Sequence, residues 1–197
     1  MAKTIETYKG MPVIEASDSK DLEKKLEKME RIKPPFAVKI SRRTKMIKKD
    51  AFNSCTYIAA ILIPDSVTEI GPVAFSRCTG LTSINIPDSV TKIGWSAFYG
   101  CTGLTSINIP NSVTKIGGST FQGCMVLTSV NIGNSVTEIG DHAFCDCIGL
   151  TSINIPDSVT KIGDYAFYGC TGLTSVNIGN SFTWIGDGAF DGCPGKP

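Results

Sequence analysis

A block of 23 residues repeats seven times along the chain, without an insertion, between residues 35 and 195. Repetition at a fixed period of this length is typical of architectures in which each unit packs only against its neighbours. The chain is therefore predicted to form a solenoid of seven coils that share one continuous core. The seven units are 35–57, 58–80, 81–103, 104–126, 127–149, 150–172 and 173–195.

A phenylalanine and a cysteine each recur at a fixed position in all seven units, and both are predicted to point into the core. The first is a phenylalanine: Phe52, Phe75, Phe98, Phe121, Phe144, Phe167 and Phe190. The second is a cysteine: Cys55, Cys78, Cys101, Cys124, Cys147, Cys170 and Cys193. Because the cysteines recur in phase with the phenylalanines, we interpret them as small buried hydrophobes. Cysteines of adjacent coils would point side by side, which is poor geometry for a disulfide.

The third unit, LTSINIPDSVTKIGWSAFYGCTG, indicates how one coil is built. Isoleucines alternate with Ser83 and Asn85, the period-two pattern of a short half-buried strand. Pro87 ends this strand, because proline cannot donate to a strand ladder. A second short extended piece follows over 90–93. The stretch 95–101 is too short for a stable helix, so we predict a 3₁₀ or single helical turn there.

The consensus of the units, L-x-x-I-x-I-P-x-S-V-T-x-I-G-x-x-A-F-x-G-C, resembles the BspA-like, or treponemal-type, leucine-rich repeat. The resemblance covers residues 35–195, more than four-fifths of the chain. It implies a right-handed solenoid, which is α/β by the convention of leucine-rich repeats but dominated by β-strands. It also implies a microbial surface protein that adheres to host matrix proteins or to other cells, and it implies no catalytic residues.

The residues before the first unit do not follow the repeat and are predicted to cover its open end. Residues 17–19 supply helix-capping side chains, and Leu22, Leu26 and Met29 follow at helical spacing. An amphipathic helix of this kind would shield the core of the first coil. The alternative is a remnant of a separate partner-binding domain. The chain is thus divided into a small α/β cap over residues 1–34, with a strand or hairpin at 4–16, and a solenoid over 35–197.

The stretch GDHAFCDCIGL places His142, Cys145 and Cys147 within six residues, a spacing close to that of zinc ligands. Cys147 is the core cysteine of the fifth unit, so a three-ligand site would require it to turn outward. His142 and Cys145 occupy positions that vary between units and are expected on the outer turn. We therefore predict no metal site, and Cys145 is the candidate for an exposed, reactive thiol.

The sequence contains few residues that could form a catalytic site. Each glycine ends a repeated element, so no glycine-rich phosphate loop opens a helix. His142 is the single histidine, and no acidic partner for it stands outside the repeat pattern. Asp88 and Asp157 occupy turn positions, where aspartate bonds to the backbone. The chain is therefore predicted not to be an enzyme and to need no cofactor.

Positive charge gathers in the first unit. Residues 1–50 carry 14 Lys and Arg against 8 Asp and Glu, whereas the remainder carries 5 against 10. The basic run within 39–49 is interpreted as a contact for an anionic partner, a nucleic acid or a membrane surface, as a nuclear-import signal, or as a soluble outer face. Aromatic residues are not interleaved with these charges, which argues against nucleic acid. The candidate anion contacts are Arg42, Arg43, Lys45, Lys48 and Lys49.

The sequence leaves the location of the protein open. It contains no run of about 18 apolar residues, so no transmembrane segment is predicted. The N-terminus MAKTIETYKGMP lacks the apolar core of a secretory signal. The two readings are an intracellular protein and a secreted or cell-surface protein whose signal has been trimmed.

The outward positions of the longer strands are nearly identical in units three to seven, so they form a polar face without an aromatic or arginine anchor. Variation concentrates on the turns and in the last unit, where Phe182 replaces an inward valine and Trp184 an outward Lys or Glu. The final strand would also have an open edge. The C-terminal coil is therefore predicted to pair with a second copy or with further sequence, unless Trp184 lies flat on its own coil. The candidate partner-binding residues are Phe36, Lys39, Leu62, Trp95, Tyr99, Tyr165, Tyr168, Phe182 and Trp184.

These observations favour a non-catalytic scaffold for protein–protein interactions, whose partner the sequence does not identify. The competing hypothesis is a microbial surface adhesin or a structural, self-associating module that binds host matrix proteins or a repetitive polymer. The two differ in their energetics. A specific protein partner should be lost on a few point changes, whereas a polymer should be bound with an avidity that grows with the number of units.

Overall fold

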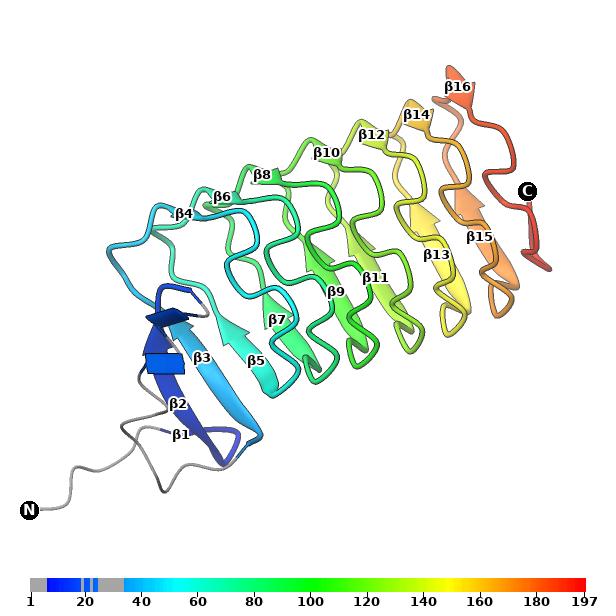
Figure 1. The fold of residues 1–197 in the computed structure, drawn as a ribbon. Coiled ribbons are helices and arrows are strands. Elements are labelled where there is room, and N and C mark those ends of the chain that lie inside the picture. The colour runs from blue at the N-terminus through cyan, green and yellow to red at the C-terminus, as the bar shows by residue number, and fades with distance from the viewer. Residues whose placement is uncertain (1–6, 19, 22, 25–33) are drawn as a thin grey trace, which may run out of the picture.

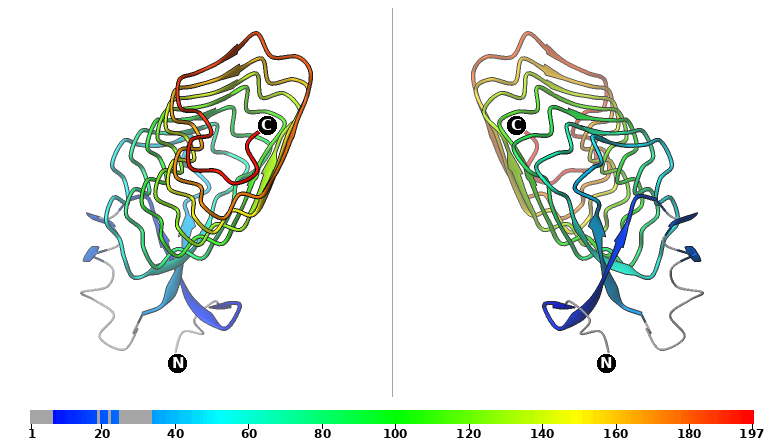
Figure 2. Two further views of the ribbon diagram at one scale, coloured as in Figure 1. Left: turned by 90° about the vertical axis from the view of Figure 1, so that its right-hand side faces the viewer. Right: turned by 90° about the vertical axis from the view of Figure 1, so that its left-hand side faces the viewer.

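The computed structural model describes residues 7–18, 20–21, 23–24 and 34–197. From residue 35 onward the chain winds into a stack of coils, one for each unit of the sequence (Figure 1). Figure 2, which looks along the stack, shows successive coils following nearly the same outline. The prediction of a β-dominated solenoid with a 23-residue repeat is confirmed.

Each coil contributes one longer and one short strand, and two further strands precede the first coil. The N-terminal strands are β1 (Thr7–Tyr8) and β2 (Met11–Ala16). The longer strands of the coils are β3 (Phe36–Ile40), β5 (Ile58–Leu62), β7 (Ser83–Asn85), β9 (Ser106–Ile109), β11 (Ser129–Ile132), β13 (Ser152–Ile155) and β15 (Ser175–Ile178). The short strands are β4 (Met46–Ile47), β6 (Glu69–Ile70), β8 (Lys92–Ile93), β10 (Lys115–Ile116), β12 (Glu138–Ile139), β14 (Lys161–Ile162) and β16 (Trp184–Ile185).

Strands of adjacent coils pair in parallel, with equivalent residues side by side. The short strands form one seven-stranded sheet from β4 to β16, in which Ile116 aligns with Ile93 and with Ile139. The longer strands are divided. β3, β5 and β7 join β1 and β2 in a five-stranded sheet, whereas β9 pairs with β11 and β13 with β15.

The core is a ladder of equivalent apolar side chains with the phenylalanines at its centre. Their rings stack from coil to coil with centroids 5.1–5.6 Å apart. The cysteines add a polar contact, because the Sγ of Cys101 donates to the Phe75 carbonyl at 3.1 Å and five other cysteines do the same one coil apart. Cysteine suits this position because it packs as a small apolar group and still donates a weak hydrogen bond.

The turn that follows each short strand is not helical. In the third coil Ser96 and Gly100 have positive φ angles of 51° and 65°, and the equivalent residues of every coil do the same. Two left-handed residues within five are incompatible with a 3₁₀ or α-helical turn, so that prediction is wrong. The backbone bonds to the next coil instead: the N–H of Phe98 donates to the carbonyl of Thr120 at 2.9 Å.

A β-hairpin lies at the N-terminal end of the stack, within the stretch for which a strand or hairpin was expected. β1 and β2 pair antiparallel through Lys9 and Gly10, which both have positive φ as a two-residue hairpin turn requires. β2 then pairs in parallel with β3, where Ile14 aligns with Val38 and both side chains are buried. The hairpin therefore continues the sheet of longer strands beyond the first coil (Figure 1).

A helix begins after Asp18, whose carboxylate accepts the N–H of Asp21 at 2.9 Å as a helix cap does. Residues 20–21 and 23–24 are helical. The described residues include no helix that is long and apolar enough to cross a membrane. The remaining predicted cap positions, Ser19, Leu22, Leu26 and Met29, lie outside the described residues, so the covering role of this helix stays a prediction.

Candidate interaction surfaces

The outward side of the longer strands, which we call the strand face, is polar and uniform from β7 to β15. Each of these strands presents a serine and an asparagine. The asparagines bond to one another: Asn131 Nδ2 donates to Asn108 Oδ1, and Asn177 Nδ2 donates to Asn154 Oδ1. Short amides that are already engaged in this way supply no large anchor for a partner. The strand face is therefore as uniform and polar as the near-identical outward residues of units three to seven predicted.

Two predicted partner-binding residues, Lys39 and Leu62, come together where β3 and β5 end. They line a hollow of about 570 Å³ that also includes Arg42, one of the predicted anion contacts. Residues 63–66 form the opposite wall, with the apolar Ile63 among them. The hollow therefore combines apolar side chains with the cationic Lys39 and Arg42 and with the acidic Asp65.

Phe36 is not available to a partner. It is 1% exposed, and its ring lies 5.3 Å from the ring of Tyr57. The side chain alternates in phase with Val38 and Ile40, so it points inward, and a register shift after Phe36 lets it pair with Ile58. The prediction that Phe36 faces outward is therefore wrong.

The five predicted anion contacts surround β4 on the first coil, and all five are exposed. Lys48 and Lys49 directly follow that strand and open the first turn. Lys49 Nζ lies 4.0 Å from Asp50 Oδ2, an exposed contact that contributes little energy. The first coil thus carries an open concentration of positive charge.

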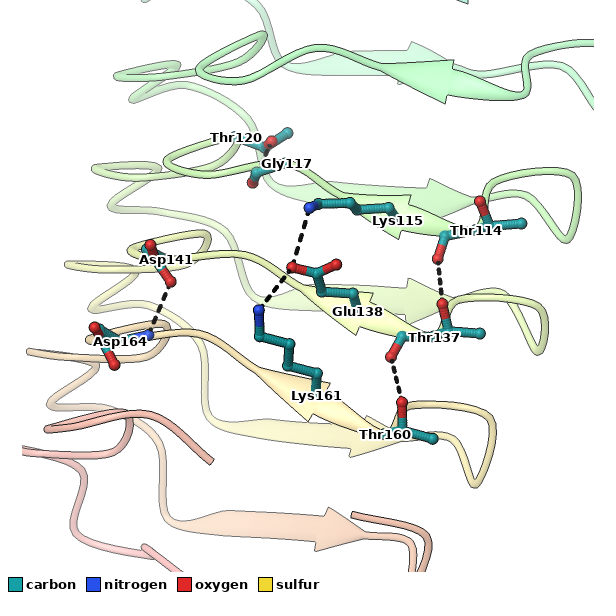
Figure 3. A network of polar contacts seen from close by, with 10 residues as sticks. All are labelled: Thr114, Lys115, Gly117, Thr120, Thr137, Glu138, Asp141, Thr160, Lys161 and Asp164. Carbon is teal, nitrogen blue, oxygen red and sulfur yellow. Dashed lines mark hydrogen bonds and ion pairs between the residues drawn. The ribbon is translucent and has the colours of Figure 1, made fainter. Parts of the chain in front are cut away.

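The outward residues of the short strands form a charged ladder (Figure 3). Glu138 Oε1 lies 3.0 Å from Lys115 Nζ and 3.5 Å from Lys161 Nζ, and Lys92 Nζ lies 2.7 Å from Glu69 Oε1. Partial burial raises the pKa of Glu138, but the hydrogen bond and charge of Lys115 and the charge of Lys161 outweigh it, so that pKa lies below its ordinary value. These side chains are occupied with one another, and we assign them to stability.

The outward residues of the turns, at positions 94–100 of the third coil and their equivalents, form what we call the turn face. Trp95 is 53% exposed there. The guanidinium carbon of Arg77 lies 6.0 Å from the ring centroid of Tyr99, within cation–π range. Together with Asn53 and Ser96, these side chains line a shallow hollow of about 290 Å³. Arg77, Trp95 and Tyr99 define the Trp95 patch.

A second aromatic group, the Tyr165 patch, consists of His142, Tyr165 and Tyr168. The Tyr165 ring lies 5.2 Å from the His142 ring and meets the Tyr168 ring edge-on at 5.8 Å. It also reaches over the last coil, where a β-carbon on Gly188 would come within 2.6 Å of Tyr165 Cε1. The turns of coils five to seven contain no Lys or Arg but five aspartates, namely Asp141, Asp146, Asp164, Asp187 and Asp191. This patch is therefore aromatic and negatively charged.

Cys145 is not the exposed thiol that the sequence predicted. It is 4% exposed. Its Sγ accepts from Gln122 Nε2 at 3.8 Å and donates to Asp146 Oδ2 at 3.5 Å. Burial raises the pKa of the Cys145 thiol to about 11, and the Asp146 charge adds to the rise. The position does lie on the outer turn, but a short cysteine stays within the turn where the longer Tyr168 extends beyond it.

His142, Cys145 and Cys147 face different surroundings. Cys147 is fully buried and donates to the Phe121 carbonyl at 3.3 Å, whereas His142 packs against an exposed tyrosine. In the part of the chain that the structure describes, no group of three or more His, Cys, Asp or Glu side chains is placed to hold a metal ion.

Among the described residues, the last coil has a neighbouring coil on one side only. Ile185 is 43% exposed, although its equivalent Ile162 is fully buried. Trp184 is 42% exposed and lies over its neighbour in the charged ladder, with Lys161 Nζ 5.1 Å from the ring centroid. Phe182 is half-buried and packs against the core. Of the two predicted contacts in this coil, Trp184 is thus the more accessible.

Sequence reasoning missed Arg77 and the turn aspartates as parts of a surface. A comparison of equivalent positions between the units would have found them. Arg77 is the one cation at a position that the other coils fill with Ser54, Asp146 or glycine. The charges of the turns were counted only within the totals for residues 1–50 and for the rest of the chain. Those totals do not show that the charge of the turn face changes sign along the stack.

The chain matches the family model of the BspA type leucine-rich repeat region over residues 36–151 and 137–196, in six copies. A leucine-rich repeat protein of T. pallidum has a similar structure, with a TM-score of 0.77 and 34% identity over 82% of this chain and 78% of that one. No curated protein matches the chain.

Two longer proteins are also similar in structure. A leucine-rich repeat protein of Bacteroides ovatus is 36% identical, over 81% of this chain and 47% of that one, with a TM-score of 0.65. A leucine-rich cell surface protein of Faecalibacterium prausnitzii is 37% identical, over 71% of this chain and 38% of that one, with a TM-score of 0.65. The chain therefore spans less than half the length of these two proteins.

Proposed function

Because the chain belongs to the BspA type leucine-rich repeat family, we propose that it is a non-catalytic scaffold for protein–protein contacts and that its partner binds the turn face. In a leucine-rich repeat, the core residues pack against those of the neighbouring coils and are not available to a partner. Binding therefore depends on the residues that differ from coil to coil. In this chain those residues lie on the turns.

The observation that carries the proposal is the uneven distribution of exposed aromatic side chains. Four aromatic side chains of the described residues are more than 40% exposed: Trp95, Tyr165 and Tyr168 lie on the turn face, and Trp184 lies on the short strand β16. Aromatic and arginine side chains dominate the binding energy of protein interfaces, and Tyr and Trp bury a large area at a low entropic cost. The strand face presents short polar side chains instead.

The C-terminal coil is a second proposed contact, through Trp184 and the edge of β15. A homodimer through this coil remains a prediction. The N–H groups of Gly188, Phe190 and Gly192 donate to no backbone carbonyl among the described residues. Two copies that met end to end would bring these donors against each other, which opposes such pairing along the turns. A partner that supplies carbonyl groups fits this end better.

The experiment is photo-crosslinking in the cells that produce the protein. A benzophenone amino acid is placed at Trp95 or Tyr168 on the turn face and, as matched controls, at Asn108 or Asn154 on the strand face. We expect covalent adducts from the turn-face positions, and the captured protein, once purified, should bind the unmodified chain saturably. Adducts that form at the strand-face positions alone would overturn the proposal.

The alternative function is adhesion to a matrix protein or a repetitive polymer at the cell surface. It is favoured by one observation, since the F. prausnitzii protein of similar structure is described as a cell surface protein. Under this alternative, immobilised matrix proteins should retain the chain with an avidity that rises when copies of the solenoid are fused in tandem. Equal retention of single and tandem forms would argue against it.

A further inference from the structure

The charge of the turn face changes sign along the stack. The turns of coils one and two carry Lys48, Lys49 and Arg77 against the single Asp50. The turns of coils three and four carry no charged residue, and those of coils five to seven carry the five aspartates. The face is therefore positive at one end, neutral in the middle and negative at the other end.

We infer that the partner of the turn face is a second copy of this chain, packed antiparallel around a two-fold axis at coil four. The inference rests on the proposed function, because it names the partner of the same surface. In such an isologous pair coil three lies against coil five, coil two against coil six, and coil one against coil seven. Each positive coil of one copy then faces a negative coil of the other, twice per dimer.

The aromatic patches are placed to match this pairing. Phe75 and Phe167, which mark coils two and six, each lie two spacings of 5.2–5.4 Å from Phe121 in coil four. The hollow of the Trp95 patch, centred on coil two, would thus lie opposite Tyr168 of the other copy. A phenol ring that enters this hollow comes to rest beside the Arg77 guanidinium, where a cation–π contact adds to the burial.

Coil four suits a position on the two-fold axis because its turn begins with small residues and its one longer outward side chain, Gln122, is directed at Cys145 of the next coil. Its outward residues begin Gly117, Gly118 and Ser119, where the third coil has Gly94, Trp95 and Ser96. Because no aromatic side chain stands at the axis, two turn faces can approach closely enough for the flanking patches to touch. Larger residues occur on either side, in coils three and six.

The size of the surface sets the strength expected of the pair. Seven coils span roughly 32 Å and one turn is about 10 Å wide, which gives a projected area of about 320 Å² per copy. Because side chains make the face uneven, each copy buries on the order of 500 Å² of accessible surface. An interface of this size is at the lower end of specific contacts, and we expect a dissociation constant of about 10–100 µM. Because opposite charges supply much of the attraction, the dimer should weaken as salt is raised.

Sedimentation velocity of the full chain from about 5 to 500 µM tests the inference. The first variant combines Lys48→Asp with Lys49→Asp, and the second combines Asp187→Lys with Asp191→Lys. Each is expected to be monomeric alone, because like charges then face each other at both ends of the pair. Their equimolar mixture should form dimers again, because every contact between unlike copies regains opposite charges. This recovery also shows that both variants are folded.

Arg43→Asp with Lys45→Asp is the matched control, since it makes the same charge change on the first coil but outside the turn face, and it should still dimerise. A wild type that stays monomeric at 500 µM overturns the inference. So does a dimer that survives both charge reversals or that Trp184→Lys abolishes. Turn-face crosslinks to a different protein alongside a monomeric wild type would reject self-pairing and leave the scaffold proposal standing.

Discussion

The two ends of the solenoid carry equivalent residues but bury them differently. At the N-terminal end, Ile47 and Phe52 of the first coil are fully buried. At the C-terminal end, Phe190 is 8% exposed and Ile185, the equivalent of Ile47, is 43% exposed. The hairpin strand β2 lies beside the first coil, whereas the last coil has a described neighbour on one side.

The difference shows that a coil does not bury its own core. Ile162 and Ile185 occupy the same position in adjacent coils, and one further coil lowers the exposed fraction from 43% to 0%. Each coil is thus stabilised mainly through its two interfaces, as in a linear chain of neighbour interactions. The energy of any substitution should therefore depend on how many neighbours its coil has.

The largest expected effect comes from removing residues 1–34, which would give the first coil an end as open as the last one. The change strips β2 from β3, together with the buried Ile14 and Ala16. We expect a loss on the order of 4 kcal/mol in unfolding free energy and association through the exposed edge of β3. Thermal unfolding and sedimentation measure the two effects. Ile14→Ala in the full chain tests the same packing, and an unchanged melting temperature in both proteins would reject a covering role.

The next effect compares the same residue in the middle and at the end of the stack. Phe121→Ala removes a ring that is stacked on both sides, at 5.4 Å and 5.3 Å, and should cost about 3–5 kcal/mol. Phe190→Ala removes a ring with one stacked neighbour, at 5.1 Å, and should cost roughly half as much. Urea unfolding measures both. Equal costs would contradict the view that each coil depends on its two interfaces.

The sequence predicted the parts of the fold that the repeat dictates and missed those set by single residues. The alternation of apolar and polar residues and the 23-residue period were enough to predict the coils, the parallel ladders and the buried Phe and Cys positions. Units of nearly identical sequence bury the same face, so equivalent residues lie side by side. The left-handed turn residues escaped notice, since Ser96, His142 and Tyr165 all adopt positive φ without a shared glycine. For Cys145, position alone predicted exposure, whereas the length of the side chain decided it.

Thiol reactivity compares the middle of the stack with its C-terminal end, and the expected difference is smaller. Burial raises the pKa of Cys124, in the middle of the stack, to about 12, and it also raises the pKa of Cys193 at the open end. A disulfide reagent at pH 8 should modify none of the eight cysteines rapidly, and Cys193 should react first, because the last coil opens most easily. Peptide mapping identifies the site. Prior labelling of Cys145, or equal rates at Cys124 and Cys193, would contradict this order.

Removing a charge from the charged ladder should change the unfolding free energy by a still smaller amount, which again depends on whether the residue has a partner in both adjacent coils. Glu138 contacts Lys115 and Lys161, and the two lysines lower its pKa. A lowered carboxyl pKa stabilises the fold above the unfolded value of about 4.3 and is lost as the pH falls through the folded value. Glu138→Gln should therefore cost about 0.5–1 kcal/mol at pH 7 and close to nothing once the pH has fallen well below the folded pKa.

Glu69→Gln, which removes a residue with one ion-pair contact to Lys92, is the matched control and should cost about half as much at pH 7. Urea unfolding across this pH range measures both variants. A cost for Glu138→Gln that stays constant down to pH 3 would show that the ion pairs do not account for it.

The smallest effect is expected for Trp184→Lys in the last coil. Trp184 is nearly half exposed and makes a cation–π contact with Lys161, which is worth about 0.5 kcal/mol at an exposed site. The substitution should therefore lower the unfolding free energy by about that amount, and Trp184→Phe should lose less because it keeps an aromatic ring. A loss above about 2 kcal/mol would mean that the tryptophan is buried in solution against a second molecule. Repeating the measurement at several protein concentrations separates the two cases, since stability supplied by self-association grows with concentration whereas that of an open end does not.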